Sequence, residues 1–114
     1  METNVLRGQA YYTTMAEKNI EGIKKYLHND VEFFGPLSTF KGKEAVSQSI
    51  AGFMNVFKSL ENQAAFGSDD KVAVVYIVKF QNIPDTPSVA WLQFKDGLIT
   101  RIQLFFDAGA FRQK

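Results

Sequence analysis

The sequence predicts an α+β fold in which three N-terminal helices pack on one face of a strongly curved, mostly antiparallel sheet. Two observations lead to this class. Apolar residues recur at helical spacing up to about Leu60, and beyond that point they alternate as they do in strands. In addition, two β-rich runs within Ser88 to Phe111 meet at Asp96-Gly97, which supplies the positive φ angles of a tight hairpin turn.

Two helices are predicted at the start of the chain. The first covers Thr3 to Ala16, and the second begins after Asn19, whose side chain can cap it. The apolar stripe of the second helix consists of Ile20, Ile23, Tyr26 and Leu27. We expect His28 to Asp30 to break this helix. Val31 to Phe34 then forms a short strand, which stops at Gly35-Pro36 because proline cannot donate to a ladder.

The clearest helix is predicted from Lys43 to about Leu60. Its apolar face carries Val46, Ile50, Phe53, Met54 and Phe57. The remaining segments are strands at Gln63 to Phe66 and Lys71 to Phe80, a loop at Asn82 to Pro87, and the hairpin around Asp96-Gly97. This order of elements supports helices on one face of the sheet.

Composition limits the possible functions. With 114 residues and 46% hydrophobic content, the chain fits a single domain, residues 1–114, whose interior is rich in aromatic rings. A net charge of +1 from evenly spread residues gives no attraction to nucleic acid or to an anionic membrane. The absence of Cys excludes disulfides and thiol chemistry. No signal peptide or membrane-spanning run is visible, so we expect a cytoplasmic location and no membrane partner.

Several short segments together resemble a known superfamily over nearly the whole chain. Tyr11 and Tyr12 lie in the first helix, Asp30 to Phe33 runs into Gly35-Pro36, Phe40 to Val46 leads into the third helix, and Phe106-Asp107 ends the last strand. In order and spacing these segments resemble the SnoaL-like and nuclear transport factor 2-like superfamily, which includes steroid isomerases, polyketide cyclases and epoxide hydrolases. The resemblance implies a conical α+β fold with an internal cavity and without a cofactor.

The groups that carry the chemistry of those enzymes are mostly missing. The resemblance to the isomerases places Tyr11 where they hold a tyrosine that hydrogen-bonds a developing enolate. It places Gly35 at the position of their base and Ala90 at the position of their second acid, and neither residue carries a carboxylate. The epoxide hydrolases hold an acid at the position of Leu104. The sequence therefore does not favour an enzyme of either type.

Asp107 is the strongest catalytic candidate, with Tyr11 as its polar partner. The polyketide cyclases that it resembles continue in a pattern approached by Asp107, Phe111 and Gln113, and there Asp107 would act as general acid or base. The alternative is a capping residue for a short helical turn over Ala108 to Phe111. Strand alternation favours the cap, because Asp107 points away from the cone if Phe106 points into it. Tyr11 has its own alternative, a hydrogen bond to a buried carbonyl.

Other ionisable residues give no second site. His28, near the end of the second helix, is expected to be solvated and not catalytic. The carboxylates at Glu17, Glu21, Glu32, Asp69 and Asp70 have no spacing that suggests a metal, so we expect none.

The main hypothesis is an apolar cavity that binds a small hydrophobic molecule. The predicted wall consists of Tyr11, Met15, Phe33, Ile50, Phe53, Phe57, Ala90, Leu92, Ile102, Leu104 and Phe106. One alternative is an isomerase- or cyclase-type enzyme that uses Asp107 and Tyr11. Another is a protein-interaction module whose interior is simply filled core.

The other face of the hairpin has the composition of a protein interface. It carries Trp91, Gln93, Arg101, Gln103 and Phe105, a mixture of aromatic, amide and guanidinium groups. Members of the superfamily that the chain resembles pair through this face, so the expectation is a homodimer. The alternative is a solvated face with one partly exposed Trp.

Overall fold

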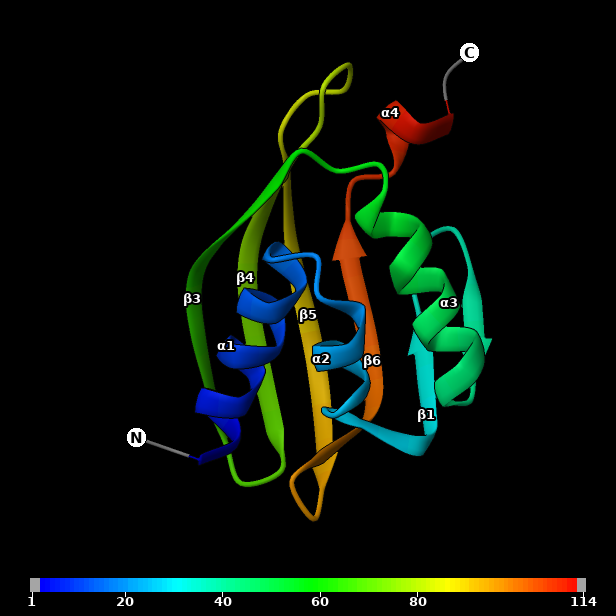
Figure 1. Ribbon diagram of the computed structural model, residues 1–114. Coiled ribbons are helices and arrows are strands. Elements are labelled where there is room, and N and C mark those ends of the chain that lie inside the picture. Colours follow the sequence, from blue (N-terminus) through cyan, green and yellow to red (C-terminus); the bar gives the residue numbers. More distant parts are fainter. Residues whose placement is uncertain (1–2, 113–114) are drawn as a thin grey trace.

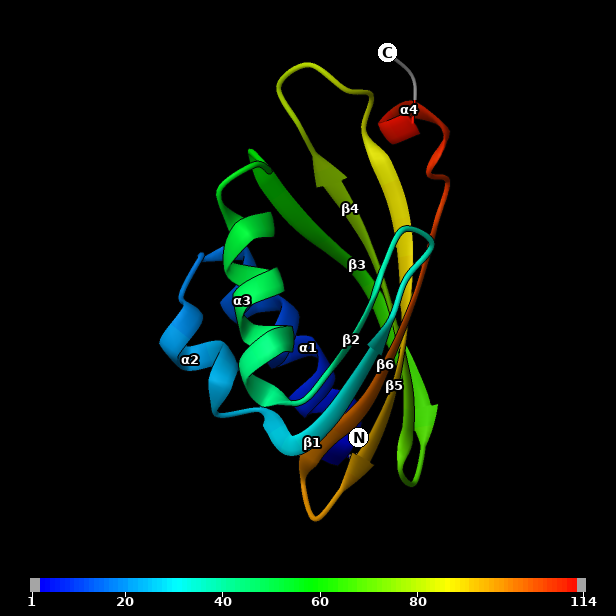
Figure 2. The same cartoon turned by 90° about the vertical axis from the view of Figure 1, so that its right-hand side faces the viewer.

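The computed structural model describes residues 3–112 and confirms the α+β class with a curved sheet and helices on one side of it (Figures 1 and 2). The elements are α1 (Thr3–Ala16), α2 (Ile20–Lys24), β1 (Leu27–Phe34), β2 (Thr39–Lys41), α3 (Lys43–Met54), β3 (Ser59–Ser68), β4 (Lys71–Lys79), β5 (Thr86–Lys95), β6 (Leu98–Phe106) and α4 (Gly109–Arg112). The first three helices cover the inner face of the sheet.

The sheet is mostly antiparallel, as predicted. Its strand order is β2-β1-β6-β5-β4-β3, and the pair formed by β1 and β6 is parallel while the other pairs are antiparallel. The parallel pair follows from the chain path, because α3 and four strands separate β1 from β6 in sequence. As a result the first and last strands lie side by side in the middle of the sheet.

The predicted hairpin joins β5 to β6. Asp96 has a φ of 52° and Gly97 a φ of 81°, both in the left-handed region that a tight turn requires. Pairing runs from Lys95 opposite Leu98 to Ser88 opposite Phe106, with one irregularity next to Phe94. The turn therefore sets which side chains of these two strands face the helices.

The packing of α1 against the sheet changes along the helix. At Gly8 an added Cβ would lie 3.1 Å from Val72 Cγ1 and 3.3 Å from Val74 Cγ2, so the helix backbone touches β4 here. One turn later the ring of Tyr12 stacks on the ring of Tyr76 with 4.5 Å between centroids. Aromatic rings thus occupy the space between helix and strand, and the interior is wider at this end.

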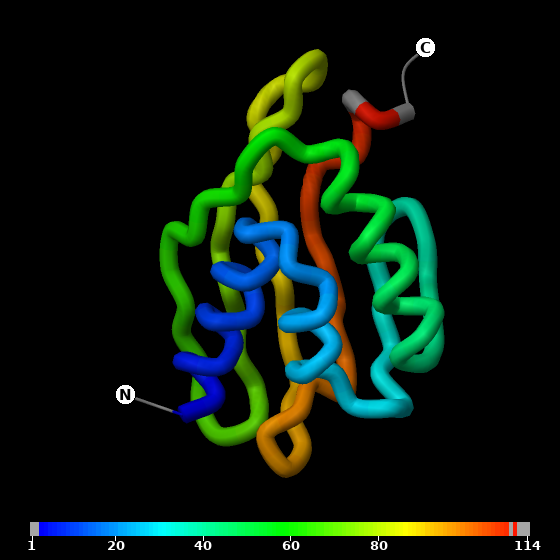
Figure 3. The backbone as a smooth tube through the Cα atoms, in the orientation of Figure 1, coloured from blue at the N-terminus to red at the C-terminus, as the bar shows by residue number. Residues whose placement is uncertain are grey.

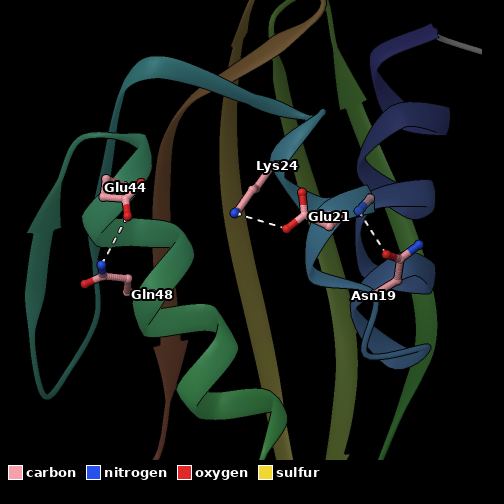
Figure 4. Close-up of polar contacts among 6 residues, drawn as sticks. Asn19, Glu21, Lys24, Glu44 and Gln48 are labelled. Atoms are coloured by element: carbon pink, nitrogen blue, oxygen red, sulfur yellow. Dashed lines mark hydrogen bonds and ion pairs between the residues drawn. The ribbon is translucent and has the colours of Figure 1, made fainter.

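Local polar contacts fix the shorter helices. Asn19 Oδ1 accepts the Gly22 N–H at 3.0 Å, which confirms the predicted cap of α2 (Figure 4). Lys18 Nζ donates to the Phe57 carbonyl oxygen at 2.6 Å and lies 4.7 Å above the Phe57 ring. This side chain ties the connection after α1 to the connection after α3.

Several predicted boundaries are wrong. The segment His28 to Asp30 does not end a helix but belongs to β1, which starts at Leu27 because Leu27 pairs with Ile99. The loop predicted at Asn82 to Pro87 is shorter, because Thr86 and Pro87 already pair with β4. Proline fits there because β6 pairs with β5 only from Ser88 onward.

The third helix is shorter than predicted, and the strand after it is longer. Helix α3 ends at Met54, and Lys58 N–H donates to the Lys79 carbonyl oxygen at 2.7 Å, which starts the pairing with β4. Strand β3 therefore begins at Ser59, and Leu60 lies in a strand. This strand forms the edge of the sheet and is mostly exposed, so it has little of the alternation that marks a strand in sequence.

Two glycine substitutions should change stability in opposite directions. A Cβ at Gly67 would lie 2.8 Å from Val72 Cα and would overlap the Lys71 carbonyl oxygen, whereas a Cβ at Gly52 meets nothing within 4 Å. We predict that Gly67→Ala lowers the free energy of unfolding by about 2 kcal/mol. Gly52→Ala on the exposed side of α3 should raise it by about 0.5–1 kcal/mol. Urea unfolding followed by circular dichroism measures both, and a shift of the same sign in the two variants would contradict the prediction.

Candidate functional site

A cavity of about 280 Å³ lies at the wide end of the cone, where β4 and β6 finish and β5 starts. Helix α1 contributes Tyr11, Tyr12 and Met15 to its wall, and α3 contributes Ile50 and Phe53. The loop between β4 and β5 and helix α4 extend beyond the sheet at this same end (Figure 3). The cavity therefore lies at the end of the cone where the rings of Tyr12 and Tyr76 separate α1 from the sheet.

The structure places the predicted wall residues in two groups. The cavity is lined by Tyr11, Met15, Phe33, Ile50, Phe53, Leu104 and Phe106. The remaining four, Phe57, Ala90, Leu92 and Ile102, are buried in the core and do not line the cavity. All four face the interior, as predicted, but they pack against neighbouring core side chains.

The cavity wall also includes residues that were not predicted. Tyr76, Val78 and Phe80 line it from β4 and its end, and Thr86 and Ser88 line it from β5. Alternation along Lys71 to Phe80 could have found the β4 residues, because they share one face of a regular strand. Alternation with Ala90 and Leu92 could also have found Ser88. Thr86 lacked such a signal, because a small polar residue beside prolines is typical of a loop.

Three tyrosines form the polar part of the site. Burial raises the pKa of Tyr11, and the nearby Tyr76 phenol raises it further. Burial also raises the pKa of Tyr12 well above its ordinary value, with smaller contributions from Tyr76 and Tyr11 and from a hydrogen bond to Tyr76. Burial raises the pKa of Tyr76 as well, and hydrogen bonds with Tyr12 and Ser88 offset part of this rise. All three are therefore neutral hydroxyl groups at physiological pH.

Aromatic contacts and a turn surround the cavity mouth. The ring of Phe111 in α4 meets the ring of Phe80 at 5.3 Å between centroids and that of Phe106 at 5.5 Å. On the other side, Leu37 in the turn after β1 is half exposed, and Val56 after α3 is more exposed still. The entrance is thus itself apolar.

Asp107 lies outside the cavity. Its carboxylate is exposed, and Oδ1 accepts the Gly109 N–H at 2.9 Å, so the side chain caps the start of α4. Phe106, the residue before it, lines the cavity, which is the alternation expected in a strand. In the structure Asp107 therefore has the position of the capping alternative. Gln113, the last residue of the cyclase pattern, lies outside the described residues.

Charged groups are absent from the described part of the cavity wall. Within residues 3–112 the lining contains no Asp, Glu, Lys, Arg or His. His28 lies elsewhere, in β1, where its Nδ1 accepts the Asp30 N–H at 3.0 Å. The same residues include no group of three or more His, Asp or Glu side chains placed to hold a metal ion. Over this range no helix is long and apolar enough to cross a bilayer.

The outer face of the sheet carries an apolar strip. Phe66, Trp91 and Phe105 are exposed by 59%, 37% and 51%. Trp91 pairs with Ala73 on one side and Gln103 on the other, and Phe66 pairs with Ala73, so these side chains form a row across four strands. We call Phe66, Ala73, Val75, Val89, Trp91 and Phe105 the outer strip. It contains two of the residues predicted for a dimer face.

Polar groups border the outer strip. Gln93 pairs with Arg101, and the Arg101 guanidinium lies 4.3 Å above the ring of Phe34. On the far side of Arg101, where β1 pairs with β2, Lys41 Nζ lies 3.4 Å from Glu32 Oε2. The predicted face thus has an apolar centre and a polar border, which is the arrangement found in many protein interfaces.

Comparison with known proteins gives one family and many similar folds. Residues 9–102 match the SnoaL-like domain, whereas no curated protein matches the sequence. A protein from Kribbella flavida has a TM-score of 0.90 at 19% identity, covering 96% of this chain and 90% of that chain. A steroid delta-isomerase from Pseudomonas aeruginosa has a TM-score of 0.79 at 16% identity, covering 94% and 81%.

A third similar structure contains a bound small molecule. It is a protein with a ketosteroid isomerase-like fold from Catenulispora acidiphila in complex with trimethylamine, with a TM-score of 0.76 at 17% identity, covering 91% of this chain and 87% of that chain. At these identities the similarity shows the fold alone.

The buried tyrosines should make the protein sensitive to alkali. Their pKa values are raised in the folded state, so the stability that they contribute is complete below about pH 10 and is lost as the pH rises above it. Each group should then lower the free energy of unfolding by about 1.4 kcal/mol per pH unit. Urea titrations between neutral and strongly alkaline pH measure this slope. Tyr11→Phe keeps the ring but removes one ionisable hydroxyl group, so the fall in the free energy of unfolding should be less steep by about 1.4 kcal/mol per pH unit. An unchanged slope would contradict the prediction.

Proposed function

Because this chain belongs to the SnoaL-like domain family, we propose that it is a binding protein for a small hydrophobic molecule. The observation that supports this most directly is the cavity of about 280 Å³ at the wide end of the cone. This volume is close to the lower end of the range for small-molecule pockets, about 300 Å³. The volume supports a ligand cavity over the alternative of a filled core.

The composition of the wall supports an apolar ligand. Phe33, Phe53, Leu104 and Phe106 present carbon atoms to the cavity, and the rim is apolar as well. Burying apolar surface yields about 25 cal/mol per Å², so a ligand that fills such a cavity gains affinity from contact area alone.

A catalytic function receives less support. An isomerase of the type that the chain resembles needs a base and a second acid in the cavity, and the resemblance places Gly35 and Ala90 at these two positions. Gly35 lines the cavity without a side chain to abstract a proton. Asp107, the remaining carboxylate candidate, is exposed and caps α4. Tyr11 lines the cavity, but its raised pKa makes it a hydrogen-bond donor and not a base.

We also propose that two copies of the chain pair through the outer strip. Its exposed aromatic side chains lie in two neighbouring rows across the sheet, and the charged and amide groups at its border can align the two copies. No helix covers this face in the described part of the chain (Figure 2). A second copy would remove Phe66, Trp91 and Phe105 from water, which supports association.

Filling the cavity should abolish ligand binding. Leu104 faces the cavity and Phe105, its neighbour in β6, lies on the outer face, so tryptophan at each position adds bulk on opposite sides of one strand. We predict that Leu104→Trp weakens binding of the neutral probe N-phenylnaphthylamine by at least about tenfold. Phe105→Trp should leave the affinity within about twofold of the wild type.

Probe fluorescence measures both affinities. Equal loss of binding in the two variants, or no loss in Leu104→Trp, would contradict a ligand site in this cavity. Native mass spectrometry of protein purified from its own host provides an independent check, because a bound molecule adds directly to the chain mass of 12.9 kDa.

The proposed dimer should depend on Trp91. We predict that the wild-type protein sediments at twice its chain mass, and that Trp91→Glu sediments as a monomer, because a charge at the centre of an apolar interface cannot be desolvated without a partner. Val56→Glu is the matched control, since Val56 is 63% exposed and lies at the cavity mouth. It should remain a dimer. Analytical ultracentrifugation measures the mass of the wild type and of both variants. A monomeric wild type would rule out the proposed dimer.

A further inference from the structure

Helix α4 lies at the mouth of the cavity. It extends beyond the end of β6, outside the sheet (Figures 1 and 2). Its Phe111 ring lines the cavity together with the rings of Phe80, which follows β4, and Phe106, which ends β6. Because β5 lies between β4 and β6 in the sheet, Phe111 bridges two strand ends above the start of β5. One aromatic side chain therefore covers this side of the mouth.

Ring contacts hold Phe111 in this position. Its ring meets the ring of Phe80 at an interplanar angle of 76° and the ring of Phe106 at 77°, so both contacts are edge-to-face. The Phe111 side chain nevertheless remains partly exposed. A partly exposed ring gives up less buried surface when it moves than a core side chain does. These contacts therefore define one position for the ring and can still be released.

The connection from β6 to α4 is short, and its hydrogen bonds are local. Asp107 and Ala108 belong neither to the strand nor to the helix. Asp107 Oδ1 accepts the Gly109 N–H at 2.9 Å, and the Ala108 carbonyl oxygen accepts the Phe111 N–H at 3.0 Å. Both bonds lie within residues 107–111, so they shape this segment without joining it to another element. The segment can therefore move as one body about the end of β6.

The cap gives Asp107 a function outside the cavity. A capping side chain fixes the direction in which a helix leaves the preceding strand, because its oxygen holds the first free N–H groups of the helix. In α4 this direction brings Phe111 onto the rings of Phe80 and Phe106. Asp107 is thus a positioning residue that acts on the cavity mouth through Phe111.

We propose that α4 is a lid that controls how fast the cavity exchanges its ligand: Phe111 closes the mouth, and the Asp107 cap holds the lid in the closed position. This inference rests on the proposed binding function and concerns the regulation of the same site. A lid slows association and dissociation together, because a ligand enters and leaves only while the lid is open. A fixed wall residue in contact with the ligand affects mainly the dissociation rate.

Stopped-flow fluorescence with N-phenylnaphthylamine measures both rates. Phe111→Ala should raise the association rate and the dissociation rate at least about fivefold each, because both ring contacts that hold the lid closed are lost. Leu6→Ala is the matched control, since Leu6 is an exposed apolar residue of α1 that does not line the cavity. Its two rates should stay within about twofold of the wild type.

Variants of Asp107 separate a moving lid from a fixed ring. Asp107→Ala keeps the Phe111 ring but removes the cap, so the lid should open more often and both rates should rise about twofold to tenfold. Asp107→Asn keeps a capping oxygen and should retain both rates within about twofold of the wild type. Asp107 is exposed, so these two variants carry the test if Phe111→Ala does not fold, as judged by circular dichroism.

The outcomes distinguish the lid from the binding function beneath it. Faster dissociation with an unchanged association rate, or faster exchange in Phe111→Ala without any change in Asp107→Ala, overturns the lid and leaves the binding function standing. Equal acceleration in Asp107→Ala and Asp107→Asn overturns the role of the cap. If the wild-type protein does not bind the probe, the binding function fails and the lid fails with it.

Discussion

The spacing between α1 and β4 is the constraint on which the rest of the structure depends. Gly8 allows the helix backbone to touch Val72 and Val74, whereas one turn later two stacked rings, Tyr12 and Tyr76, stand between helix and strand. The interior is tight at one end and open at the other for this reason. A larger residue at Gly8 would have to move the helix or the valines, because an interior packed at this density cannot absorb a methyl group without a shift.

The same strands build two surfaces, because side chains alternate along them. In β5 and β6, Ser88 and Leu104 face the cavity while Trp91 and Phe105 face outward. A partner on the outer strip would therefore pack on the backbone that positions the cavity wall. Adjacent residues such as Leu104 and Phe105 share this backbone, yet each side chain contributes to a different surface.

The sequence predicted which face each residue of the hairpin would occupy, and it predicted less well how deep in the cone the residue would lie. Alternation with the Asp96-Gly97 turn was enough to place Leu92 inside and Trp91 outside. It could not show that Leu92 would be packed in the core while Leu104 lines the cavity, because depth depends on what α1 places opposite each residue. Boundaries failed where long-range pairing prevailed over local pattern, as in the edge strand β3.

The chemistry of the cavity follows from this arrangement of hydroxyl groups without an acid. The neutral hydroxyl groups of Tyr11, Tyr12 and Tyr76 can donate hydrogen bonds to a ligand, but proton abstraction also needs a base beside the same ligand. Gly35 provides no base, and Asp107 is turned outward by the alternation that turns Phe106 inward. Replacing Gly35 by an acidic residue would place a charge in a cavity whose described lining contains no counter-ion. Neutral hydroxyl groups and apolar surface in the described wall therefore favour the proposed binding of an uncharged molecule.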